Sequence, residues 1–303
     1  MPELPDVEVY LAALRPRVVG QPLAGVRLGS PFVLRSVSPP LGEAAGRTVV
    51  AVRRLGKRVV LVLEGELFLV IHLMIAGRLQ WKPPRATIPR RLGLAAFDFQ
   101  AGTLLLTEAG SKKRASLHLV AGEDALAEHD PGGLEVLAEP DDRLIEVFQA
   151  VNHTLKRALT DPHIFSGIGN AYSDEILHRA RLSPFKQTRH LAPAEAERLI
   201  TACRQVLTEW RDRLLSQTGD DFPTKVTAFR PEMAVHGRHR QPCPVCDAPV
   251  QRIVYAETEC NYCPGCQTDG RILADRVLSK LLKDDWPKTL DELETHRGLG
   301  RSS

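Results

Sequence analysis

The pattern of apolar and polar positions changes twice along the chain. Residues 24–120 contain short segments rich in valine and leucine, separated by glycine and other turn residues. Apolar segments that recur about every 8–12 residues predict the strands of a β-sandwich or barrel. Hairpin turns are expected at 64–67 and 100–103. From about residue 125 the apolar residues recur at helical spacing instead. Helices are expected over 125–137, 141–161, 170–182 and 192–215.

The first residues form a separate pattern ahead of the strands. Residues 3–19 have apolar positions near helical spacing, which predicts a helix over about 4–16. Pro2 lacks a backbone N–H and suits a helix start. Asp6 and Glu8 have a plain interpretation as acids that favour the positive end of the helix dipole. The chain is therefore expected to be an α+β protein of several domains.

Composition narrows the class of protein. The 303 residues suffice for about two domains, and 43% hydrophobic with 25% charged residues is typical of a globular chain. A net charge of +3 permits a nucleic-acid partner without requiring one. There is no apolar run long enough for a membrane span, and the acidic start does not resemble a signal peptide. We expect no membrane association and a cytoplasmic location, nucleoid-associated if the source is bacterial.

Cysteines indicate a metal site near the C-terminus. Two Cys-x-x-Cys pairs frame a segment that can form a hairpin, which is the spacing of a zinc ribbon. Four thiolates close the coordination shell of one Zn²⁺, so this metal is expected to be structural and not catalytic. Cys260 is interpreted as a thiol on the hairpin and Cys203 as a core residue. The predicted ligands are Cys243, Cys246, Cys263 and Cys266.

A glycine-rich turn precedes one of the predicted helices. Gly167, Gly169 and Asn170 stand at its start, where backbone N–H groups can bind a phosphate. A plain connection between helices is the commoner explanation of such a turn. Lys156 and Arg157 lie shortly before it and are available for phosphate contacts, although most surface basic residues have no such role.

Three motifs in order resemble the formamidopyrimidine-DNA glycosylase/endonuclease VIII family of base-excision repair enzymes. They are the start Pro-Glu-Leu-Pro-Asp-Val-Glu, the segment 155–177 and the four-cysteine finger, and the likeness covers residues 1 to about 268. It implies a helix with a β-sandwich, a helix–two-turn–helix domain and a zinc hairpin, acting as a monomer on damaged DNA. We expect the domains at 1–122, 123–234 and 235–275, with a C-terminal extension at 276–303.

The resemblance implies a use for the N-terminal proline. Once Met1 is removed, the secondary amine of Pro2 is the nucleophile that attacks the sugar C1′ and expels the damaged base. A free α-amino group has a pKa near 8 and so is partly neutral at physiological pH. The resulting iminium allows β- and δ-elimination, which cut the strand on both sides of the lost sugar. Glu3 carries protons in ring opening, and Lys57 contacts a phosphate and assists proton transfer.

The helical segment supplies the implied DNA contacts. Lys156 and Asn170 match phosphate-binding positions of the family, and Gly169 belongs to the same turn. Glu175 matches a family acid that supports the active site.

Departures from the family concern the residues that fill the gap left by a flipped nucleotide. The family has His-Leu-x-Met-x-Gly where this chain has residues 72–77. Ile75 takes the Met position and Met74 stands one residue early. On a strand, a shift of one residue moves a side chain to the other face.

The second and third departures are a loop and a finger residue. Lys112, Lys113 and Arg114 lie where the family has an Arg–Phe pair, and no aromatic wedge is present. These basic residues are expected to contact phosphates, or else form a solvated turn. Thr258 replaces a family arginine, for which Arg252 is a nearby substitute. Selectivity for 8-oxoguanine is therefore not expected to carry over. Oxidised pyrimidines, ring-opened purines, abasic sites, single-stranded DNA or crosslinks are alternatives.

Three functions fit the sequence to different degrees. The leading hypothesis is a bifunctional glycosylase/AP lyase. The second is a DNA-binding or damage-binding protein of the same fold without catalysis, which leaves the retained Pro2, Glu3 and Lys57 unexplained. The third is a zinc-ribbon protein of RNA or protein interactions, which explains neither the N-terminal motif nor the glycine-rich turn.

Overall fold

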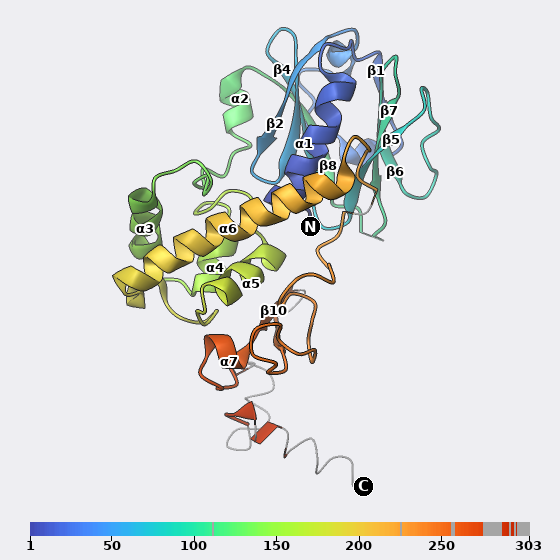
Figure 1. Ribbon diagram of the computed structural model, residues 1–303. Coiled ribbons are helices and arrows are strands. Elements are labelled where there is room, and N and C mark those ends of the chain that lie inside the picture. Colours follow the sequence, from blue (N-terminus) through green and yellow to red (C-terminus); the bar gives the residue numbers. More distant parts are fainter. Residues whose placement is uncertain are drawn as a thin grey trace. The chain divides into compact units, whose positions relative to one another are not determined.

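The computed structural model describes residues 1–110, 112–224, 226–255, 258–274, 287–290, 292–293 and 295 (Figure 1). The chain divides into two compact units, each treated by itself below. Unit 1 comprises Met1–Gly133 and Leu207–Ala228, and unit 2 comprises Leu134–Val206 and Phe229–Ser303. Most of the expected extension at 276–303 lies outside the described residues.

Unit 1 is a β-sandwich, as the strand spacing predicted. Each sheet has four antiparallel strands. One sheet has the order β1 (Gly25–Leu28), β6 (Gly93–Asp98), β7 (Thr103–Glu108), β5 (Gly77–Lys82). The other has the order β2 (Val49–Leu55), β3 (Arg58–Leu63), β4 (Leu67–His72), β8 (Ser116–Ala121). The predicted turns connect β3 to β4 and β6 to β7. Short 3₁₀ helices lie at Pro31–Val33 and Leu41–Ala44.

The core of unit 1 lies between the sheets and the first helix. α1 (Leu4–Val18) extends two residues beyond the predicted end and packs its buried side chains, among them Tyr10 and Leu14, into this core. A second cluster covers the other face of β3 and β4, where α2 (Glu123–Ala127) contributes Leu126. Because β3 and β4 are buried on both faces, their sequences are almost continuously apolar and do not alternate.

Unit 2 begins with helices. They are α3 (Asp141–Ala150), α4 (Leu155–Thr160), α5 (Asn170–Arg179) and α6 (Pro193–Thr218), with a 3₁₀ turn at Thr188–His190. α6 is long enough to belong to both units. The expected helix at 141–161 is divided, because Thr154 begins a new helix by accepting a hydrogen bond from the N–H of Arg157 at 3.3 Å. The helix expected over 125–137 is limited to α2, since the irregular segment that follows contains Pro131 and Gly132, and Gly132 has a positive φ of 83°.

A hairpin completes unit 2. β9 (Gln251–Tyr255) and β10 (Thr258–Tyr262) pair antiparallel, with Cys260 opposite Ile253, and the short α7 (Pro264–Gln267) follows. This confirms the hairpin predicted between the cysteine pairs. Among the helices of the described residues, we find none with the length and apolar character needed to cross a membrane.

Candidate active site and metal centre

The amino terminus lies in a partly buried, charged environment. Burial lowers the pKa of the Met1 amine below its usual value of 8.0, and the charges of Arg78 and Lys57 lower it further. Glu3 and Asp6 act in the opposite direction. The amine is therefore surrounded by two cations and two acids, and its protonated form is disfavoured overall.

The start of α1 fixes the residues beside this amine. Pro2 and Glu3 are both buried. Asp6 accepts a hydrogen bond from the backbone N–H of Glu3 at 3.0 Å, and Glu8 pairs with Arg54 at 2.8 Å. Asp6 and Glu8 thus have structural roles, in line with their plain interpretation. Glu3 is the acid directly next to Pro2 in the chain.

Lys57 lies in the two-residue turn between β2 and β3 and is partly exposed. Arg54 donates to the carbonyl of Gly56 in this turn at 3.0 Å while it also pairs with Glu8. A continuous polar connection therefore runs from α1 to the turn that carries Lys57, which keeps the lysine close to the amino terminus.

Met74 and Ile75 lie in a turn and not on a strand. β4 ends at His72 and β5 begins at Gly77, so the expectation of opposite strand faces was wrong. Ile75 is 53% exposed, and Met74 has a positive φ of 52°. A Cβ at position 77 would lie 2.2 Å from the carbonyl oxygen of Leu73, so the tight turn requires glycine there. The turn therefore presents Ile75 to solvent.

Arg78 shapes the same turn from the strand that follows it. Its Nη1 donates to the carbonyls of Ile75 at 3.2 Å and Gly77 at 2.7 Å. The same guanidinium lowers the pKa of the terminal amine. Sequence analysis did not identify Arg78, because its bonds to the turn carry no sequence motif and its effect on the amine depends on the tertiary fold.

The basic turn between β7 and β8 is held by a buried acid. The Glu108 side chain accepts hydrogen bonds from the backbone N–H groups of Arg114 at 2.9 Å and Ala115 at 3.1 Å. The Lys113 ammonium donates to the Glu108 carbonyl. Lys112, Lys113 and Arg114 are all exposed. The turn is thus fixed at its base while its charges face solvent.

Lys156 is bound within unit 2. Its ammonium donates to the Asn170 carbonyl at 2.7 Å, the Ser173 hydroxyl at 2.8 Å and the Asp174 carboxylate at 2.6 Å. Asn170 is the first residue of α5 and Gly169 its N-cap. The lysine therefore fixes the beginning of α5, where the helix dipole favours an anion.

Asp174 is the centre of this network. Its side chain is fully buried and accepts hydrogen bonds from Lys156, His236 at 2.8 Å, and both the backbone and side-chain amides of Asn261 at 3.1 and 3.3 Å. Burial alone would raise its pKa, but Lys156 and His236 hold the pKa below its usual value. One carboxylate thus joins α4, α5, the segment before the hairpin and β10.

Glu175 fixes the chain that leads into the hairpin. Its carboxylate accepts from the N–H groups of Ala234 at 2.7 Å, Val235 at 2.9 Å and His236 at 2.9 Å. Burial raises the pKa of this carboxyl, and the three N–H donors act against that rise. Within unit 2, Glu175 therefore stabilises a loop conformation.

The sulfur atoms of the predicted ligands gather at one point. The Sγ–Sγ distances are 3.3 Å for Cys246–Cys263, 3.4 Å for Cys246–Cys266 and 3.8 Å for Cys243–Cys266. Thiolates about 2.3 Å from a tetrahedral zinc lie about 3.8 Å apart, so the donor set fits this ion. A Cβ on Gly265 would come within 2.9 Å of the Cys246 sulfur, which explains the glycine in this knuckle.

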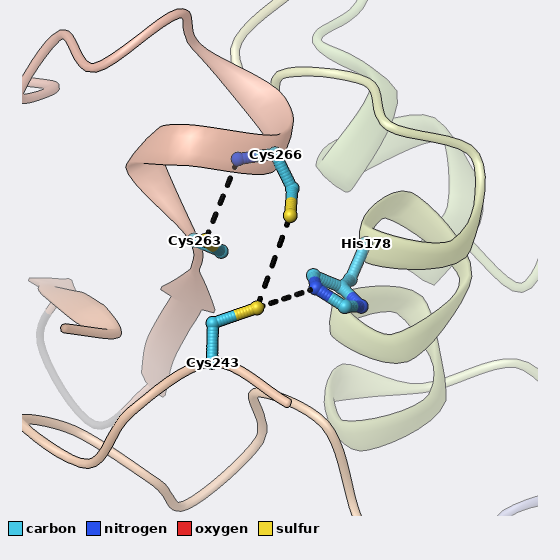
Figure 2. Close-up of side chains that lie close together, drawn as sticks. All are labelled: His178, Cys243, Cys263 and Cys266. Carbon is cyan, nitrogen blue, oxygen red and sulfur yellow. Dashed lines mark hydrogen bonds between the residues drawn. The ribbon is translucent and has the colours of Figure 1, made fainter. Parts of the chain in front are cut away.

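Two further groups lie near the cluster. Cys260 is buried in the hairpin, and neither Cys260 nor Cys246 belongs to the group of ligand atoms that all lie within 4.8 Å of one another. His178 of α5 joins three of the cysteines in a group whose ligand atoms all lie within 4.8 Å of one another. Figure 2 shows its ring directed at the Cys243 sulfur.

Comparisons with known proteins agree with this architecture. The sequence model of the formamidopyrimidine-DNA glycosylase N-terminal domain matches residues 1–116, and that of the H2TH domain of the same enzyme matches residues 133–211. A formamidopyrimidine-DNA glycosylase of Thermus thermophilus is 36% identical over 284 residues, which cover 89% of this chain and 100% of the relative. The chain belongs to the formamidopyrimidine-DNA glycosylase family.

Solved structures have the same fold as this family member. The crystal structure of a Thermus thermophilus protein of the family gives a TM-score of 0.73 at 32% identity and covers 88% of this chain and 98% of its own. The Lactococcus lactis glycosylase, solved with DNA containing an AP site, gives 0.76 at 23% identity, with 88% and 99% covered.

The glycosylase has functional candidates that sequence analysis missed. Arg78, Glu108, Asp174 and His236 position other groups, and His178 approaches the cysteine cluster. Single polar residues of this kind belong to no sequence motif. Of the network around Asp174, sequence analysis identified only Lys156 and Glu175 as site residues. The partners of Asp174, His236 and His178 are 18 to 87 residues away, so spacing alone gives no signal for them.

Proposed function

We propose that this family member is a DNA-repair glycosylase and AP lyase whose nucleophile is the amine of Pro2 after removal of Met1. The observation that carries the proposal is the buried, charged environment at the start of α1, where burial and the charges of Arg78 and Lys57 lower the pKa of the Met1 amine, the group directly before Pro2. An amine in this environment is neutral, and so nucleophilic, at a lower pH than a free α-amine.

The proposed chemistry assigns one step to each group. The amine lone pair forms a bond to C1′, the glycosidic bond breaks, and the base leaves with a proton. Glu3 delivers the proton that opens the sugar ring, and the secondary amine becomes an iminium. This electron sink allows elimination of the 3′ phosphate and then the 5′ phosphate. Lys57 binds a phosphate next to the reacting sugar and assists proton transfer.

Phosphate binding in the proposal involves two separate surfaces. Asn170, with its N-cap Gly169, presents the positive end of α5 to one phosphate. The exposed turn of residues 112–114 supplies positive charge in unit 1. Lys156 serves the first of these surfaces by positioning Asn170, since its ammonium already donates to three acceptors. Glu175 supports the same unit through the loop at 234–236.

We further infer one structural Zn²⁺ in the cluster of Cys243, Cys246, Cys263 and Cys266, and a monomer that acts on damaged DNA in the cytoplasm. The thiolates fit zinc by number and spacing. Bound zinc would hold the hairpin, which is too small for a core of its own.

The lesion is proposed to differ from 8-oxoguanine. The exposed apolar tip of the turn at 73–76 is Ile75, with Met74 beside it, and the turn at 112–114 has no aromatic side chain. The isoleucine side chain is shorter and branched at Cβ, so it reaches less far than methionine into the gap behind a flipped nucleotide. Flipping an abasic site or a base that is already poorly stacked costs less stacking energy, so a small inserted side chain is sufficient.

Borohydride trapping on abasic-site DNA tests the catalytic proposal. The expected result is a covalent adduct that peptide mapping places on Pro2, in protein shown by mass spectrometry to lack Met1. Pro2→Gly should lose most of the lyase activity. Pro5→Ala is the matched control, because it alters the same helix start but keeps the secondary amine of Pro2. Folded protein that binds the DNA without forming an adduct would favour the non-catalytic DNA-binding alternative.

A further inference from the structure

The metal cluster has a fifth donor from outside the hairpin. His178 lies near the end of α5 and is 7% exposed, and its Nε2 lies 3.3 Å from the Sγ of Cys243 (Figure 2). The four cysteines already supply the number of ligands that a structural zinc takes. An imidazole beside a complete shell is therefore available to donate a hydrogen bond to a ligand.

We propose that His178 is a positioning residue of the metal centre, whose Nε2–H donates to the Cys243 thiolate and is not itself a zinc ligand. The inference rests on the proposed zinc site but not on the proposed catalytic chemistry. Partners that orient metal ligands in this way typically change metal affinity by about 10–100-fold.

Burial explains why Cys243 needs this donor. A zinc ion with four thiolates carries a net charge of −2, and a buried charge requires hydrogen bonds to replace water. Cys243 is fully buried, and its sulfur accepts a long backbone hydrogen bond, from the N–H of Val245 at 3.5 Å. Cys246, by contrast, is exposed, so water can solvate its sulfur. The histidine thus supports a ligand that solvent cannot reach, while the equally buried Cys263 accepts from the backbone N–H of Cys266 at 3.4 Å.

The same hydrogen bond ties α5 to the finger. α5 already contacts β10 through Asp174 and Asn261, and the Gln267 side chain of α7 donates to the Leu182 carbonyl just beyond α5 at 2.9 Å. His178 adds a contact with the metal ligand between these two points. The position of α5, and with it Asn170 at its start, is thereby coupled to metal binding.

Cobalt substitution in the full-length protein tests the assignment. Thiolate-to-Co²⁺ charge-transfer absorption scales with the number of coordinated thiolates. We expect the His178→Leu protein to keep the wild-type absorption intensity while its Co²⁺ and Zn²⁺ affinities, measured by chelator competition, fall by about 10–100-fold. His178→Gln should recover part of the affinity, because its amide can donate. Cys246→Ser should lose about a quarter of the intensity. The exposed His190 gives a matched control in His190→Leu, which should bind metal as wild type does.

A spectroscopic readout separates hydrogen bonding from packing. In ¹¹³Cd-substituted wild-type protein, a ¹H–¹¹³Cd correlation should connect the metal with the Hε2 of His178 through the sulfur. Wild-type metal affinity in His178→Leu would overturn the proposal by reducing His178 to a packing residue. Unchanged absorption in Cys246→Ser, together with reduced absorption or shifted bands in His178→Leu, would overturn it by making His178 the fourth ligand. Wild-type protein without any thiolate charge-transfer band would remove the zinc site itself, whatever the outcome of the trapping experiment.

Discussion

Substitution of Asp174 by asparagine removes the negative charge at the centre of the unit 2 network. Asp174 is fully buried, while the Lys156 side chain is 13% exposed and that of His236 3% exposed. Asparagine keeps the shape and one acceptor oxygen. It leaves the Lys156 ammonium in a largely buried position without its counter-charge.

The expected loss of unfolding free energy follows from the unpaired Lys156 ammonium. Breaking a buried ion pair by removing one partner costs about 3–5 kcal/mol. Lys156 keeps the Asn170 carbonyl and the Ser173 hydroxyl as acceptors and is slightly exposed, so the lower end of the range applies. A loss of about 3 kcal/mol corresponds to a roughly 150-fold change in the opening equilibrium of unit 2.

Hydrogen exchange read by mass spectrometry resolves where the loss occurs. Peptides from α4, α5 and β10 should exchange roughly a hundredfold faster in Asp174→Asn, whereas peptides from β3 and β4 should be unchanged. Asp142→Asn is the matched control, because Asp142 is an exposed acid of the same unit. Its neutralisation should cost less than about 1 kcal/mol.

The contribution of Asp174 to the stability of unit 2 should depend on pH in a definite direction. The pKa of Asp174 is lowered in the folded protein, so its contribution is fully present above the unfolded value of about 3.9. That contribution disappears as the pH falls through the folded pKa. The difference between wild type and Asp174→Asn should therefore shrink in acid. Equal exchange in the Asp174 and Asp142 variants at pH 7 would refute the central role of this carboxylate.

Three other outcomes follow from the site. Glu108→Gln should weaken the bonds to Arg114 and Ala115 by about 1–2 kcal/mol and lower DNA affinity several-fold, as measured by fluorescence anisotropy. The rate of borohydride-trapped adduct formation should reach half its maximum below pH 8, and Arg78→Met should move that midpoint upward, since burial and the arginine charge lower the pKa of the Met1 amine and the proposed Pro2 amine occupies the next position of the chain. Zinc chelation should abolish DNA binding while the circular dichroism of the β-sandwich persists; unchanged binding by metal-free protein would contradict the structural role.

Local patterns were sufficient to predict much of the fold. The strands of unit 1, α1, the hairpin at β9 and β10 and the cysteine cluster all arise from spacing within short segments. The family motifs likewise are contiguous. The division of the segment at 141–161 into two helices was missed, because the apolar spacing continues across Thr154 and only its capping bond marks the break.

The missed features depend on contacts between distant segments. The end of β4 at His72 is set by pairing with β3 and β8, so the sequence of the turn at 73–76 did not reveal that Met74 and Ile75 lie off the strand. Lys156 was predicted to contact phosphate, but its ammonium donates to acceptors 14–18 residues further along the chain. Such polar partners are specific to the folded structure and follow no period.

The arrangement of α5 connects these observations. A typical helix of this length buries apolar side chains, yet Ser173, Asp174, Glu175 and His178 are all buried in α5. Buried polar contacts contribute little net stability compared with apolar packing, but each requires a specific geometry. The helix is therefore located by directional bonds to α4, to the loop at 234–236 and to the cysteine finger. A helix whose first residue is proposed to bind a phosphate benefits from this type of support, because an error in its position would be felt directly at the DNA contact.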